Sequence, residues 1–97
     1  MTCEEAIQIL HKALPGLKEK YGIVDLSLFG SVARNEAGPE SDVDVLVTFG
    51  SGADLLDLVN LGFALEELLG RKVDLATPDA LRSRARPSIA RDLVHVA

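Results

Sequence analysis

The chain has 97 residues, 47% of them hydrophobic, and a formal net charge of −5 at pH 7. This length predicts a single domain over residues 1–97 with a modest core, and it excludes a multidomain enzyme. An acidic chain binds a phosphate backbone poorly, so direct binding to long nucleic acid is not expected. The one cysteine, Cys3, excludes an internal disulfide, and no apolar run has membrane-spanning length, so we expect a cytoplasmic protein.

The first predicted element is a helix that begins after Thr2. Thr2 and Glu5 have the spacing of a capping box, and the apolar residues that follow recur at a helical period. Pro15 removes a backbone amide and crowds the preceding turn. We therefore expect either a kink or two short helices, the second of which ends near Lys20.

Two strands follow, joined by a short turn. Residues 23–29 predict a strand with Val24, Leu26 and Leu28 on one face. Residues 30–34 suit a turn that starts a short helix, and residues 35–41 predict a loop. Residues 42–49 alternate apolar and other side chains and form the clearest strand of the sequence. We expect these two strands to be neighbours.

The segment from residue 54 to residue 69 predicts a helix that is apolar around most of its circumference. One face of a sheet cannot cover so much apolar surface, so the helix either contacts an oligomer or partner or is covered by the C-terminal segment. Residues 72–76 predict a third strand, residues 78–93 one or two helices broken at Pro87, and residues 94–97 a last strand. These elements predict an α/β (α+β) fold in which a small mixed sheet packs with helices.

Three features carry the candidate chemistry. Gly30 and Ser31 end a strand and open a helix, where backbone amides and a hydroxyl can hold phosphate oxygens, although most such turns are structural. Asp42 and Asp44 lie two residues apart on a strand, which puts both carboxylates on one face. Their repulsion is offset either by solvent or by a cation, and Mg²⁺ is the natural cation for oxygen ligands.

Asp74 is the third feature, a lone carboxylate in the predicted strand of residues 72–76. Aspartate is depleted in strands, so Asp74 is either a surface residue or part of a site. If its strand pairs beside the strand of Asp42 and Asp44, three carboxylates converge, a number that suits two metal ions, or two ligands and a base.

Together these residues resemble the nucleotidyltransferase superfamily related to DNA polymerase β. Its mark is Gly-Ser, a spacer of about ten residues, and Asp-x-Asp, as in Gly30-Ser31 and Asp42-Val43-Asp44. The segments LFGSVAR (28–34), SDVDVLV (41–47) and LGRKVDL (69–75) are similar to those of the minimal nucleotidyltransferases, the MNT antitoxin partners of HEPN-domain toxins. Asn35 is one departure, because many relatives have glycine at this position.

The resemblance implies a minimal nucleotidyltransferase fold and transfer of AMP from ATP to a hydroxyl. It implies that Asp42 and Asp44 bind one or two Mg²⁺ ions, and that Asp74 completes the metal site and helps to activate the acceptor. Gly30 and Ser31 would hold the β- and γ-phosphates of ATP. Arg34 would either add a charge-assisted contact or support the loop. The implied acceptor is a tyrosine of the HEPN toxin.

The sequence leaves two other functions open. In one, the protein is a non-catalytic antitoxin that neutralises the toxin by binding it through residues 54–69. In the other, it transfers a nucleotide to a small molecule or an RNA end, although the acidic balance and the missing acceptor domain weigh against this. His11 and His95 lack metal-ligand spacing and are expected to be structural or solvated.

Overall fold

The computed structural model describes residues 1–36, 38, 41–79 and 93–96 of the chain. In chain order the elements are α1 (Cys3–Tyr21), β1 (Ile23–Phe29), α2 (Gly30–Ala33), β2 (Val43–Phe49), α3 (Leu55–Leu69), β3 (Val73–Ala76) and β4 (Val94–His95). The strands form one sheet in the order β3-β2-β1-β4, in which β2 and β3 are parallel and the other pairs antiparallel. The predicted mixed sheet, and the pairing of β1 with β2, are confirmed.

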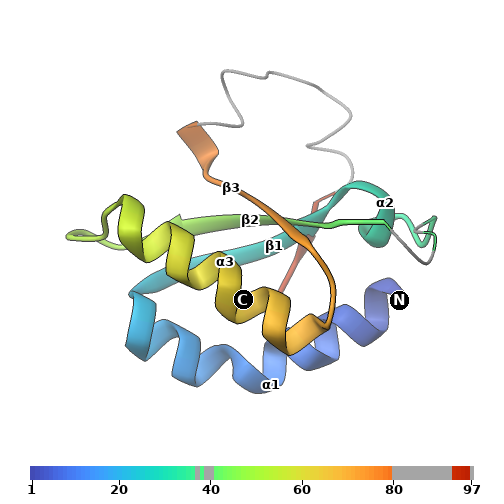
Figure 1. Ribbon diagram of the computed structural model, residues 1–97, viewed down its shortest axis with the longest axis horizontal. Coiled ribbons are helices and arrows are strands. Elements are labelled where there is room, and N and C mark those ends of the chain that lie inside the picture. The colour runs from blue at the N-terminus through green and yellow to red at the C-terminus, as the bar shows by residue number, and fades with distance from the viewer. Residues whose placement is uncertain (37, 39–40, 80–92, 97) are drawn as a thin grey trace.

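Both long helices cover the same face of the sheet (Figure 1). The alternation along β2 produces this arrangement, because Val43, Val45 and Val47 are fully buried and point toward the helices. Leu10 of α1 and Leu65 of α3 are fully buried in the same cluster. The residues of β2 that alternate with these valines, including Asp44, therefore lie on the opposite face of the sheet.

Helix α1 begins as predicted and is one continuous helix. The Thr2 hydroxyl accepts from the amide of Glu5 (3.1 Å), and the Glu5 carboxylate accepts from the amide of Thr2 (2.9 Å). The alternative of two short helices is wrong, because α1 runs without a break through Pro15 to Tyr21. Pro15 is on the exposed side of the helix, where water can satisfy the carbonyl that lacks its amide partner.

Strand β1 departs from the predicted alternation at its start. Its register with β2 shifts between Ile23 and Asp25, so Val24 is an extra residue in the strand. Val24 is 54% exposed, whereas Ile23 and Leu26 are buried. The prediction that Val24 shares a face with Leu26 and Leu28 is therefore wrong, and the bulge is the reason.

The elements after β2 mostly agree with those predicted from the sequence. Helix α3 is capped by Asp54, whose carboxylate accepts from the Asp57 amide (3.0 Å), and it ends at Gly70 in the left-handed conformation. Strands β3 and β4 confirm the third and last predicted strands. The helices predicted over residues 78–93 fall mostly on residues 80–92, outside the described part of the chain. Within the described ranges, the helices are too short or too polar to cross a membrane.

Candidate active site

Pairing between β2 and β3 brings two of the three predicted carboxylates together. Asp44 and Asp74 are Cα partners in these parallel strands, so both side chains project from the same face of the sheet. This is the face opposite the helices. Asp44 is half-buried and Asp74 is exposed.

Asp42 stands immediately before β2 and is exposed. It precedes Asp44 by two residues, the spacing that repeats one face of an extended chain. Among the described residues, however, no group of three or more His, Cys, Asp or Glu side chains is arranged to hold a metal ion. The structure thus presents an acidic sheet edge and not a closed metal cage.

Gly30 lies directly against the carboxylate of Asp44. It follows Phe29, the Cα partner of Asp44 in β1, and its φ of 73° is in the left-handed region. A Cβ atom at Gly30 would overlap Asp44 Oδ2 and approach Asp44 Cγ to 3.0 Å. Only glycine meets both requirements here, so the start of the Gly-Ser turn lies in contact with Asp44.

Ser31 and Arg34 follow Gly30 on α2 and in the turn after it. The carbonyl of Ser31 accepts from the amide of Glu36 (2.8 Å), which closes the turn that leaves α2. The Arg34 Nε donates to the Glu36 carboxylate (3.1 Å). This contact joins the end of α2 to the loop that follows it.

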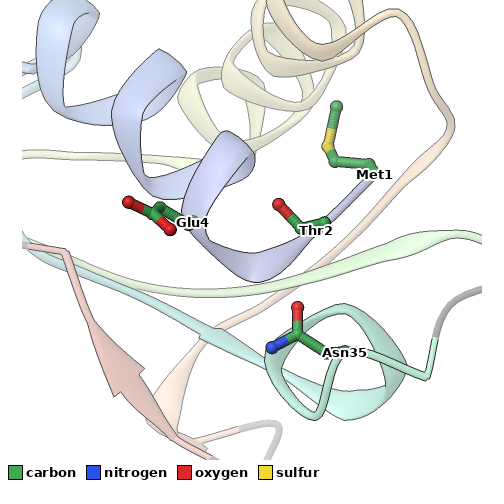
Figure 2. Close-up of a pocket in the computed structure, with 4 residues that line it drawn as sticks. All are labelled: Met1, Thr2, Glu4 and Asn35. Carbon is green, nitrogen blue, oxygen red and sulfur yellow. The ribbon is translucent and has the colours of Figure 1, made fainter.

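Asn35 ties the loop after α2 to the start of α1. Its φ of 59° is left-handed, a conformation that asparagine tolerates better than most residues, which explains why it can stand where relatives have glycine. Its side-chain Oδ1 accepts from the amide of Cys3 (2.8 Å). Figure 2 shows Asn35 with Met1, Thr2 and Glu4 around a pocket of about 400 Å³. The predicted site residues do not line this pocket.

Two side chains that the sequence did not single out hold β3 in place. Glu66 of α3 accepts from the amide of Val73 (3.1 Å), and Arg71 donates to the carbonyl of Gly38 (3.3 Å) in the loop before Asp42. The amide of Val43 donates to the carbonyl of Lys72 (2.9 Å), which starts the parallel pairing. These contacts set the register that puts Asp74 beside Asp44.

The donor chemistry of this edge fits magnesium. Like charges opposite each other on neighbouring strands are destabilising, and a bound cation would relieve the repulsion between Asp44 and Asp74. Mg²⁺ prefers oxygen ligands and is usually held by one or two carboxylates together with substrate phosphates and water. The described residues of this edge include a carboxylate pair, which has the composition of such a site.

Comparison with known proteins agrees with this composition. Residues 10–95 match the family described as Nucleotidyltransferase domain. Protein adenylyltransferase MntA of Thermococcus cleftensis is 38% identical over 96 residues, which cover 99% of this chain and 97% of the relative. A Methanocaldococcus jannaschii protein, MJ0435, provisionally named a protein adenylyltransferase, is 44% identical over 89 residues, with 92% and 95% coverage.

Solved structures share the fold. A protein provisionally identified as a minimal nucleotidyltransferase has a TM-score of 0.78 and 39% identity, and the match covers 97% of this chain and 95% of that one. A complex of an MNT antitoxin with the tri-AMPylated HEPN toxin of Shewanella oneidensis has a TM-score of 0.65 and 17% identity, with 94% and 71% coverage. The predicted minimal nucleotidyltransferase fold is thereby confirmed.

Proposed function

This chain belongs to the nucleotidyltransferase domain family, and we propose that it is an antitoxin enzyme that transfers AMP from ATP to a tyrosine hydroxyl of a HEPN-domain toxin. The observation that carries the proposal is the in-register pair of Asp44 and Asp74, with Gly30 packed against Asp44. The name of the Thermococcus relative supports adenylyl transfer to a protein. The tri-AMPylated toxin in the Shewanella complex supports a HEPN toxin as the acceptor.

Each predicted residue has a role in this reaction. Asp42 and Asp44 would hold one or two Mg²⁺ ions, which would supply positive charge to neutralise the triphosphate and the departing pyrophosphate. The amides of Gly30 and Ser31 bind the β- and γ-phosphates beside Asp44. Arg34 supports this loop through Glu36.

Asp74 acts on the acceptor. The tyrosine oxygen attacks the α-phosphorus of ATP, the bond from that phosphorus to the oxygen bridging to the β-phosphate breaks, and pyrophosphate leaves. The phenolic proton passes to the carboxylate of Asp74, which is exposed at the sheet edge and open to a docked protein. The products are AMP-tyrosine and pyrophosphate, so atoms and charges balance.

The test uses ATP labelled at the α-phosphate, Mg²⁺ and the purified HEPN-domain protein of the same genome. Wild-type chain is expected to leave a covalent label on that protein, and chelation of Mg²⁺ is expected to prevent it. Asp42→Asn and Asp44→Asn should each reduce the rate by more than about a hundredfold, because even indirect partners of a metal ligand are worth 10–100-fold.

Asp25→Asn is the matched control. Asp25 lies in β1 opposite Thr48, on the same face as Asp44 but four residues away along the sheet, and its carboxylate is bonded to His95 (2.7 Å). This variant should keep the wild-type rate. Undiminished labelling by Asp44→Asn would refute the assigned site, and a bound but unlabelled partner would refute the enzymatic antitoxin in favour of neutralisation by binding.

A further inference from the structure

Helix α3 presents a continuous apolar surface to solvent. Four large side chains on it are strongly exposed: Leu55 (74%), Leu56 (64%), Val59 (46%) and Phe63 (66%). At 100° per residue they fall within about 100° of the helix circumference, so they form one stripe along two turns. We call these four residues the α3 stripe. A contiguous apolar surface of this kind on a small domain marks an interaction site.

The α3 stripe adjoins the strand that carries Asp74. Glu66 follows Phe63 by three residues and Val59 by seven, so it lies on the same side of the helix. Its carboxylate bonds the amide of Val73 at the start of β3. In Figure 1, α3 and β3 lie together on the side of the molecule turned toward the viewer, and β3 is the edge strand on this side of the described sheet.

Charge decides between the possible occupants. Helix α3 and its N-cap carry Asp54, Asp57, Glu66 and Glu67 and no basic residue. Two copies of the chain packed through their α3 stripes would bring two such acidic helices together, which Coulomb repulsion opposes. A partner with an apolar centre and a basic rim meets no such penalty.

We propose that the HEPN toxin docks on the α3 stripe with an apolar patch rimmed by Lys and Arg, and that it extends past the edge strand β3, so that its acceptor tyrosine reaches Asp74 on the opposite face of the sheet. The proposal rests on the proposed function and deepens it, because it assigns the surface that recognises the acceptor protein.

The test measures binding without ATP or Mg²⁺, so that it is independent of catalysis. Phe63→Ser and Leu56→Ser in the full chain are titrated calorimetrically with the purified HEPN-domain protein. Each should weaken binding about tenfold or more, the usual effect of removing a buried apolar anchor from an interface. Leu68→Ser is the matched control, because Leu68 is 41% exposed on the same helix but outside the stripe, and it should change the affinity less than about twofold.

A second measurement separates the occupants and the two proposals. Sedimentation of the isolated chain should give a monomer for wild type and for Phe63→Ser. A wild-type dimer that Phe63→Ser dissociates, or equal affinities of Phe63→Ser and Leu68→Ser for the toxin, would overturn docking on the stripe. If Phe63→Ser weakens binding but wild type leaves no label on the toxin, docking is supported and the proposed reaction is overturned.

Discussion

Gly30→Ala is the substitution that most sharply links the fold to the site. The left-handed φ of 73° is unfavourable for alanine by about 1–2 kcal/mol. The new Cβ would also overlap Asp44 Oδ2, and Asp44 can escape only by leaving its preferred rotamer at a cost of about 0.5–1.5 kcal/mol. We expect a total loss of about 2 kcal/mol, which lowers the Tm of a domain of this size by roughly 8–16 °C.

The effect of Gly30→Ala on activity should exceed its effect on stability. In the altered rotamer, the Asp44 carboxylate no longer points toward the place where Asp74 and the Gly-Ser turn meet. AMP transfer should therefore fall by more than about a hundredfold, although the protein remains folded at 25 °C. Labelling of the toxin at saturating ATP measures this loss, and thermal unfolding followed by circular dichroism measures the stability.

Gly22→Ala is the control for the backbone. Gly22 has nearly the same φ, 67°, but a Cβ there would meet nothing within 4 Å. This variant should lose about 1–2 kcal/mol and keep its activity. In an Asp44→Ala background, Gly30→Ala should cost only slightly more than Gly22→Ala, because Oδ2 and Cγ have gone and only the contact with the Cβ atom of residue 44, at 3.3 Å, remains. Wild-type activity in Gly30→Ala would refute the assigned contact between Gly30 and Asp44.

Three further predictions concern stability in metal-free buffer. Asp74→Asn should raise the free energy of unfolding in urea by about 0.2–1 kcal/mol, because it removes a like charge opposite Asp44. A lower free energy of unfolding would argue against repulsion between Asp44 and Asp74. Asn35→Ala should be less stable than Asn35→Gly by about 1 kcal/mol in the same assay, because both lose the bond to Cys3 but only alanine is strained at φ 59°; equal values would contradict this. Hydrogen bonds from Thr2 lower the pKa of Glu5, the bond from the Thr2 amide most and the bond with the Thr2 hydroxyl next. The ionised Glu5 carboxylate therefore stabilises the fold above the pKa that Glu5 has in the unfolded chain, and this stabilisation is lost as the pH falls through the pKa of the folded protein. The Tm difference between wild type and Glu5→Gln should therefore shrink on acidification, and a difference that grows would contradict the assignment.

Much of the fold is visible in local patterns of the sequence. The alternation of residues 42–49 predicts β2 and the face on which Asp44 projects, and the caps Thr2, Asp54 and Gly70 mark helix ends that the structure has. These signals are local, since they depend on side-chain period and on backbone groups a few residues apart. The Asp42-x-Asp44 pair is visible in the sequence for the same reason.

The rest depends on tertiary contacts. The bulge at Val24 follows from how β1 pairs with β2, which no short window of sequence encodes. The register of Asp74 with Asp44 depends on the bonds from Glu66 and Arg71, which connect segments distant in sequence or in different elements. The hydrogen bond between Asn35 and Cys3 joins residues 32 positions apart, so the sequence shows only that asparagine replaces glycine here.

The most direct test of the carboxylate edge is nuclear magnetic resonance of the isotope-labelled chain with a non-hydrolysable ATP analogue and Mn²⁺, which shares the oxygen-ligand preference of Mg²⁺. Paramagnetic broadening of backbone amide signals should centre on Gly30, Asp44 and Asp74, and should disappear in Asp44→Asn. Broadening centred instead on Tyr21 and Asn60, which line a separate pocket between α1 and α3, would contradict the assignment of this edge as the nucleotide and metal site.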